Sequence, residues 1–248
     1  MKIKDITDYL ETIAPLSYQE SYDNSGLLCG NPSMKISSAL ICLDSTEGVI
    51  DEAIKQKCNL VIAHHPIIFS GIKKLTGKNY IERTIIKAIK NDIAIYAIHT
   101  NLDNVRDGVN KKIAERIGLK NCSPLAPLHD KLQQLVVFIP NENAAKFRQS
   151  LFDAGAGKIS NYDECSFNLQ GEGTFRGNEN SNPVIGRKEI QEHVNETRIE
   201  IIFPAHLQSQ IISAMKKNHP YEEVAYYIFP LANEWNYHGA GMIGELNT

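Results

Sequence analysis

Three short runs of apolar residues in the first half of the chain most constrain its fold. They occupy residues 38–43, 59–63 and 93–98, and each is nearly continuously apolar. In the stretches between them, apolar residues recur at helical spacing, so that each stretch has one apolar face. Buried strands that alternate with amphipathic helices are typical of a parallel sheet with crossover helices. The first half therefore predicts an α/β domain, which we place at residues 1–127.

The second half follows a different pattern, which predicts an inserted α+β module of the ferredoxin-like or PII-like type. We assign residues 128–235 to this insert and residues 236–248 to the start of a return to the first domain. The elements expected in the insert are strands at 133–139, 197–203 and 224–229, helices at 144–154 and 207–217, a hairpin at about 162–175 and a surface loop at 177–196.

Charge and cysteine usage narrow the class of protein. The 26 basic and 29 acidic residues give a net charge of -3, which provides no basic field for nucleic acid or for an anionic membrane surface. The first 16 residues predict an amphipathic helix and not a secretory signal, and no apolar run is long enough to span a bilayer. The five cysteines include no Cys-x-x-Cys pair. We therefore expect a cytoplasmic protein with no membrane partner and no nucleic-acid partner.

The pair His64 and His65, followed by Pro66, comes directly after the second apolar run. In open α/β sheets, ligand-binding groups gather beyond the carboxyl ends of the strands. Neighbouring residues that leave a strand point in different directions, so two adjacent histidines serve two metal ions more easily than one. A His-His pair on its own is more often part of a solvated loop than of a metal site. Here the residues that follow the two neighbouring apolar runs make a metal site the better interpretation.

The third run ends in the sequence HTNLD, which contributes His99 and Asp103, and Asp44 follows the first run. Together with His64 and His65, these side chains form a mixed nitrogen and oxygen set that suits zinc, manganese, iron or cobalt. We predict that His64, His65 and Asp103 bind the metal, with Asp103 as a bridge, and that His99 is catalytic or supports the ligands. For Asp44, a cap on the following helix and metal ligation are equally good interpretations.

The sequence resembles the GTP cyclohydrolase I type 2 homologues, also called NIF-three-like dinuclear-metal-centre proteins, over nearly its whole length. The segments that carry the resemblance are YDNSGL at 22–27, HHP at 64–66, HTNLD at 99–103 and HPYEEVAY at 219–226. The resemblance implies two divalent metal ions held by His64, His65 and Asp103, and a PII-like insert in the α/β metal-binding domain. It also implies ring-shaped homo-oligomers, commonly hexamers.

Two departures from that family's pattern matter. Tyr22 stands where the family usually has tryptophan, which keeps an aromatic side chain there. The family also supplies a histidine and a glutamate, four positions apart, after the insert. We therefore expect these 248 residues to be part of a longer protein that carries those ligands. His219 and Glu223 have the same spacing, but Pro220 opposes a helix there. A turn stabilised by the glutamates is the preferred interpretation of that segment, and an accessory site is the alternative.

These features predict a metal-dependent hydrolase that uses metal-activated water on a small molecule of nucleotide type. Opening of a purine ring and cleavage of a phosphodiester are both compatible with such a site. The sequence has no Walker-type phosphate loop, so metals and local side chains would hold a nucleotide. The rival hypothesis is a non-enzymatic, oligomeric metal-binding scaffold or regulatory protein with a PII-like effector module. Metal-dependent turnover distinguishes the two.

Overall fold

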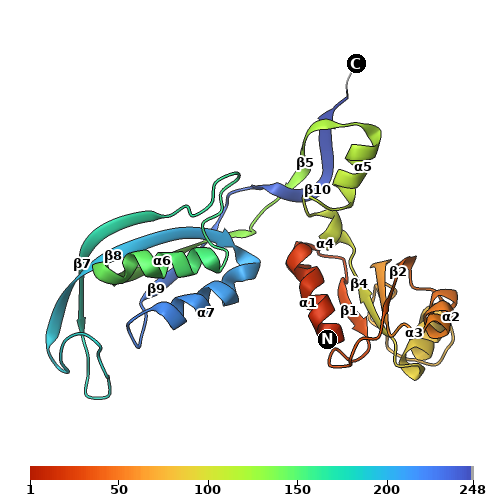
Figure 1. The fold of residues 1–248 in the computed structure, drawn as a ribbon, viewed down its shortest axis with the longest axis horizontal. Coiled ribbons are helices and arrows are strands. Elements are labelled where there is room, and N and C mark those ends of the chain that lie inside the picture. The colour runs from red at the N-terminus through yellow and green to blue at the C-terminus, as the bar shows by residue number, and fades with distance from the viewer. Residues whose placement is uncertain (247–248) are drawn as a thin grey trace. The chain divides into compact units, whose positions relative to one another are not determined.

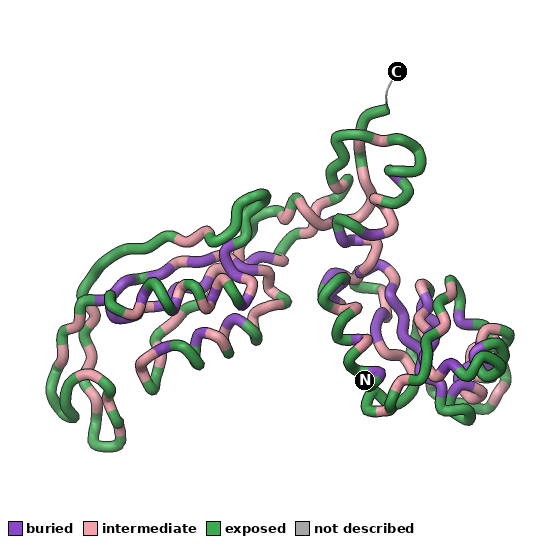
Figure 2. The backbone as a smooth tube through the Cα atoms, viewed as in Figure 1, coloured by how far each residue is buried: buried purple, intermediate pink, exposed green. Residues whose placement is uncertain are grey.

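The computed structural model describes residues 1–246 and divides the chain into two compact units. Unit 1 comprises Met1–Leu128 and the segment that begins at Tyr237, and unit 2 comprises His129–Asn236. Buried residues gather in the strands and on the inner faces of the helices within each unit (Figure 2). No helix among the described residues is long and apolar enough to cross a membrane.

A four-stranded sheet in the order β1-β4-β3-β2 organises unit 1. Strands β2, β3 and β4 are parallel, which confirms the predicted α/β class, whereas β1 is antiparallel to β4. The strand bounds are β1 (Gly26–Cys29), β2 (Ala39–Asp44), β3 (Leu60–His65) and β4 (Ala94–Ala97). Strand β1 was not predicted, because its four residues are too few to show a period.

The helices of unit 1 are α1 (Ile3–Ile13), α2 (Glu47–Gln56), α3 (Tyr80–Lys90), α4 (Thr100–Asp103) and α5 (Val109–Ile117). Three of them flank this sheet, whereas α5 packs beside β5 (Figure 1). Helices α2 and α3 cover one face and α1 lies on the other (Figure 1). The core under α2 and α3 includes Ile50, Val61, Ile85 and Ile95, whose burial provides much of the driving force for this packing. On the opposite face of the edge strand β2, Ile41 and Leu43 are exposed.

A two-stranded ribbon completes unit 1. It pairs β5 (Lys120–Leu128) with β10 (Trp235–Glu245), the segment that follows unit 2. A side chain at Gly239 would collide with the Ala126 carbonyl oxygen, 2.1 Å from an ideal Cβ, so glycine permits this close pairing. The Gly239 N–H also donates to the Asn104 carbonyl oxygen at 2.8 Å. The returning segment is thereby attached next to α4.

Unit 2 has the element order β-α-β-β-α-β. Its elements are β6 (Leu132–Pro140), α6 (Ala144–Asp153), β7 (Phe167–Arg176), β8 (Gln191–Pro204), α7 (Gln208–Asn218) and β9 (Tyr226–Leu231). The strands form an antiparallel sheet in the order β7-β8-β6-β9. Alternate residues such as Val137, Ile139, Ile199 and Ile201 face the core that contains α6 and α7. The other face of the sheet carries Phe138 and Glu196.

Two expectations for unit 2 were wrong. The hairpin expected at 162–175 is replaced by the single strand β7, which pairs along its length with β8. The loop expected at 177–196 ends earlier, because β8 begins at Gln191. Gly171 and Gly173 favoured a turn in the sequence, but they lie within β7. The structure gives Gly173 a packing reason, since a Cβ there would lie 2.1 Å from the Glu196 Oε2 atom.

Candidate metal centre

The candidate site lies at the carboxyl ends of β3 and β4, where a parallel sheet collects functional side chains. His64 and His65 are the last residues of β3. His99 follows β4 and is the N-cap residue of α4, and Asp103 is the last residue of that helix. Two neighbouring strands thus bring four of the sequence-predicted residues to one edge of the sheet.

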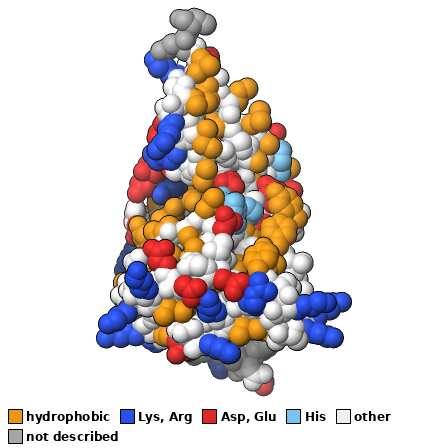
Figure 3. Space-filling model, turned by 90° about the vertical axis from the view of Figure 1, so that its right-hand side faces the viewer, with side chains coloured by type: hydrophobic (Ala, Val, Ile, Leu, Met, Phe, Trp, Pro, Cys, Tyr) orange, Lys and Arg blue, Asp and Glu red, His pale blue; other side chains and the backbone are white. Residues whose placement is uncertain are grey.

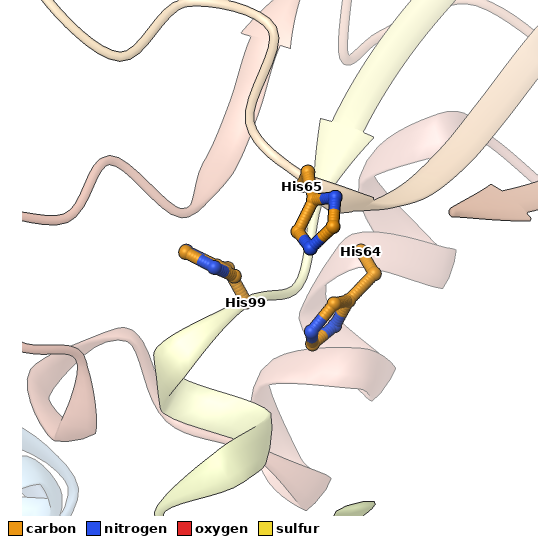
Figure 4. Close-up of side chains that lie close together, drawn as sticks. All are labelled: His64, His65 and His99. Atoms are coloured by element: carbon orange, nitrogen blue, oxygen red, sulfur yellow. The ribbon is translucent and has the colours of Figure 1, made fainter. Parts of the chain in front are cut away.

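The three imidazole rings form a nearly equilateral cluster. Their centroids are 5.0 Å apart for His64 and His65, 5.2 Å for His64 and His99, and 5.5 Å for His65 and His99. One potential ligand atom from each ring lies within 4.8 Å of the others, so the cluster could hold a metal ion (Figure 4). Asp103 lies beside this cluster, with its Oδ1 atom 3.9 Å from the His64 Nε2 atom.

Each ring is oriented through its Nδ1 atom. The Nδ1 atom of His64 lies 2.9 Å from the Ile98 carbonyl oxygen. Those of His65 and His99 lie 2.8 Å from carboxylate oxygens of Asp44 and Asp23, respectively. An Nδ1–H that donates to such an acceptor fixes the tautomer and leaves the Nε2 lone pair for a metal. The donor set therefore fits a divalent cation with nitrogen ligands.

Asp44 does not cap the helix that follows it. The Thr46 hydroxyl is the N-cap group of α2 and accepts from the Val49 N–H at 3.3 Å. The cap interpretation of Asp44 was therefore wrong. Its carboxylate instead accepts a hydrogen bond from the His65 ring. Asp44 thus acts on the candidate site by orienting His65.

Asp23 is a component of the site that sequence reasoning missed. Its fully buried side chain accepts from the His99 ring, from the Thr100 N–H at 3.0 Å and from the Thr100 hydroxyl. Burial alone would raise its pKa, but these hydrogen bonds outweigh that effect and hold the pKa at about 2. Asp23 therefore keeps its negative charge beside His99.

The antiparallel strand β1 explains how Asp23 reaches His99. Gly26 pairs with Ala97, so the residues just before β1 lie next to the residues just after β4. Asp23 belongs to the YDNSGL segment that carries the family resemblance. That segment was the available signal, but its position depended on a strand that the sequence did not reveal.

An exposed aromatic pair adjoins this network. The rings of Tyr22 and Phe69 lie 6.4 Å apart, and the two residues are 63% and 52% exposed. The two loops that carry them are joined by a hydrogen bond of 2.7 Å from the Asn24 side-chain amide to the Ile68 carbonyl oxygen. In the space-filling view, histidine side chains come to the surface between hydrophobic and acidic ones (Figure 3). The exposed rings of Tyr22 and Phe69 are planar surfaces on which an aromatic ligand can stack.

His219 belongs to unit 2 and has no free ring nitrogen. Its Nε2 atom lies 2.8 Å from the Phe138 carbonyl oxygen, and its Nδ1 atom accepts from the Tyr221 N–H at 3.1 Å. The accessory-site alternative was therefore wrong, because both ring nitrogens of His219 already have partners. The segment does form the expected turn, but His219 stabilises it, a role that was expected of the glutamates.

Comparison with known proteins identifies the family of the chain. The sequence model of Duf34/NIF3 (NGG1p interacting factor 3) matches residues 1–248. The chain belongs to the Duf34/NIF3 family. The resemblance to NIF-three-like proteins that the motifs indicated is thereby confirmed.

Relatives of this Duf34/NIF3 member carry the name GTP cyclohydrolase 1 type 2 homolog. The protein of Halalkalibacterium halodurans is 43% identical over 243 residues, which are 98% of this chain and 65% of that protein. The Bacillus subtilis protein is 40% identical over 246 residues, covering 99% of this chain and 66% of its own length. The chain thus spans slightly less than two thirds of these relatives.

Solved structures of the family share the fold. A Bacillus cereus protein related to NIF3 is 42% identical and superposes with a TM-score of 0.86, covering 100% of this chain and 66% of its own. A Staphylococcus aureus protein is 32% identical with a TM-score of 0.69, covering 100% of this chain and 64% of its own.

Proposed function

We propose that this chain forms part of a hydrolase that uses two divalent metal ions, with His64, His65 and Asp103 as ligands. Zinc, manganese, iron and cobalt all suit this donor set. The observation that carries the proposal is the cluster of three imidazoles whose Nδ1 atoms already have partners, beside the Asp103 carboxylate. Such an arrangement leaves the Nε2 lone pairs available to bind a metal ion.

His99 is the proposed catalytic residue. Divalent cations at this site would supply Lewis-acid activation of water near neutral pH. The buried Asp23 carboxylate holds the His99 ring in the tautomer with a proton on Nδ1, so Nε2 can accept a second proton. The charge on Asp23 would stabilise the resulting imidazolium. His99 can therefore act as a general base toward a reacting group.

A nucleotide-type small molecule is the proposed substrate. The exposed pair of Tyr22 and Phe69 offers planar surfaces for a base. The name of the relatives, GTP cyclohydrolase 1 type 2 homolog, points to the same class. Opening of a purine ring and cleavage of a phosphodiester remain the two candidate reactions.

Turnover of two probes tests this proposal. The chain, loaded with manganese or zinc, is assayed on GTP and on bis(p-nitrophenyl) phosphate. We expect turnover of at least one probe, and we expect His99→Gln to lower kcat by about 10²-fold or more while metal content is kept. His193→Gln is the matched control, because that histidine is an exposed residue of unit 2.

Two outcomes would contradict parts of the proposal. Tight metal binding without turnover of either probe would favour the non-enzymatic scaffold. Loss of metal from His99→Gln, as complete as from Asp103→Ala, would place His99 among the ligands and not as the general base.

We further propose that the protein assembles as a ring-shaped homo-oligomer, a hexamer by family resemblance, and works in the cytoplasm. Light scattering of the chain measures its assembled mass. A mass of one chain, 27.7 kDa, would contradict the hexamer for these residues.

A further inference from the structure

Unit 2 contains a cavity on the face of its sheet opposite α6 and α7. Its volume is about 580 Å³, within the range of sites that bind small molecules. Strands β7 and β8 form its floor, and residues of the loop that follows β7 and of the turn after α7 form its walls. Apolar side chains such as Leu169, Phe175, Val184 and Ile185 supply much of its lining.

Two glycines on one face of β7 keep this cavity open. Gly171 pairs with Glu196 on β8, and Gly173 lies two residues further along the same face. An ideal Cβ at Gly171 would meet no heavy atom within 4 Å, so that position opens into free space. At Gly173, the space that a side chain would need is filled by the Glu196 carboxylate. The glycines therefore make room for both the cavity and the carboxylate.

Glu196 is the buried charged group of the cavity. The residue is only 8% exposed, and it lines the cavity. The Tyr221 hydroxyl donates to its Oε1 atom at 2.8 Å. Among residues 1–246, the Tyr221 hydroxyl is the only group that donates a hydrogen bond to that carboxylate. A buried carboxylate can accept several hydrogen bonds, and its desolvation is costly without a positive partner.

The arginines of the cavity do not neutralise Glu196. Arg176 pairs with Glu189 at 2.8 Å, and Arg198 pairs with Glu200 at 2.9 Å. Both guanidinium groups thus have carboxylate partners of their own. The lining therefore carries more glutamates than arginines, and Glu196 is the buried one among them.

Aromatic rings stand beside this carboxylate. The rings of Phe175 and Tyr221 lie 5.8 Å apart at 59°, whereas the Phe138 ring already faces the Arg198 guanidinium, 6.0 Å from the ring centroid. Rings next to a carboxylate attract cations through their π faces. His219 fixes Tyr221 in place, because its Nδ1 atom accepts the Tyr221 N–H while its Nε2 atom is bonded to the Phe138 carbonyl oxygen.

We propose that unit 2 binds a small organic cation in this cavity, with an amine, amidinium or guanidinium group directed at Glu196 and an apolar or aromatic body against the rings. The HPYEE segment, which takes no part in the candidate metal centre, then has the role of positioning Tyr221. This site is independent of the proposed hydrolase activity, since all of its residues belong to unit 2.

Three probes of one shape and different charge test the site. Binding of benzamidine, benzamide and benzoate to the chain is measured by calorimetry or by ligand-observed NMR. We expect benzamidine to bind at least about tenfold more tightly than benzamide, and benzoate to bind most weakly, because only benzamidine carries the positive charge.

Two variants separate charge from shape. Glu196→Gln removes the charge and should bring the affinity for benzamidine down to that for benzamide. Gly171→Leu keeps the charge and fills free space in the cavity, so it should weaken all three probes. The control is Glu142→Gln, at an exposed residue of unit 2 outside the lining. Thermal unfolding verifies that each variant is folded.

Three results would overturn the proposal. The first is an affinity for benzoate that equals that for benzamidine. The second is benzamidine binding that neither Glu196→Gln nor Gly171→Leu changes. The third is no benzamidine binding up to about 10 mM, where even weak fragments bind. If the variants changed only the oligomeric state in that third case, the cavity would be part of an interface between copies of the chain.

Discussion

Asp23 shows how one buried carboxylate can organise a site made of residues from distant parts of the sequence. Its oxygens accept hydrogen bonds from the His99 ring and from the N–H and hydroxyl of Thr100. They also accept one from the Ser25 hydroxyl, at 3.1 Å. An asparagine there could accept at one oxygen only and would leave some of these donors without a partner. The residue thus connects the stability of unit 1 with the orientation of His99.

We predict that Asp23→Asn lowers the free energy of unfolding by about 1–3 kcal/mol at pH 7. The pKa of Asp23 is about 2 in the fold, against an ordinary value of 3.8. A lowered folded-state pKa adds stability above the ordinary pKa, and this stability is lost as the pH falls toward 2. The difference in the free energy of unfolding between wild type and variant should therefore shrink by about 2 kcal/mol as the pH falls from 4 to 2.

Urea unfolding with a metal chelator present measures this gap at each pH. Asp92→Asn is the control, because Asp92 is exposed in unit 1, and it should follow the wild type throughout. A gap between wild type and Asp23→Asn that stays constant down to pH 2 would contradict the ionised, hydrogen-bonded Asp23.

Sequence reasoning placed the candidate histidines better than the groups that orient them. His64, His65 and His99 could be assigned to one edge because each follows an apolar run that forms a parallel strand. Asp23 could not, because its approach to His99 depends on the antiparallel pairing of β1. Hydrogen bonds between segments 76 residues apart leave no periodic signal in the sequence.

At the scale of elements, β7 illustrates why glycine misled the sequence analysis. A Gly-rich stretch favours a turn when only local preferences are considered. In the structure the glycines face a long neighbouring strand, and Gly173 accommodates the side chain of Glu196. Glycine within a strand marks a close approach of this kind. Strands β2, β3 and β4 and the helices that follow them were predictable, because their apolar periods reflect burial, whereas this tertiary contact was not.

The two glycines of β7 give a matched pair of variants. We predict that Gly173→Ala destabilises the protein by about 1–3 kcal/mol, because Glu196 must move and lose its bond to the Tyr221 hydroxyl. Gly171→Ala meets open space and should be neutral or stabilising by up to about 1 kcal/mol. Urea unfolding midpoints compare the two. Equal effects of both substitutions would show that the Glu196 carboxylate does not occupy the space over Gly173.

At the scale of the whole molecule, the two units carry separate candidate chemistry. Unit 1 gathers nitrogen and oxygen donors at the ends of parallel strands, and unit 2 encloses an apolar cavity with one buried carboxylate. The first could be predicted from motifs at strand ends. The second could not, because its floor consists of glycines and of side chains from strands and loops that are remote in sequence. The assignment of unit 2 as a PII-like effector module stays a prediction.

The metal centre is the central claim, and anomalous diffraction from crystals grown with manganese or zinc tests it most directly. We predict two anomalous peaks beside the histidine cluster, with His64 Nε2, His65 Nε2 and an Asp103 oxygen each about 2.0–2.3 Å from a peak. Crystals of Asp103→Ala should lose or weaken both peaks, since a bridging carboxylate holds both ions. The absence of any peak at this cluster in metal-saturated crystals, or peaks held only by donors elsewhere in the chain, would contradict the account.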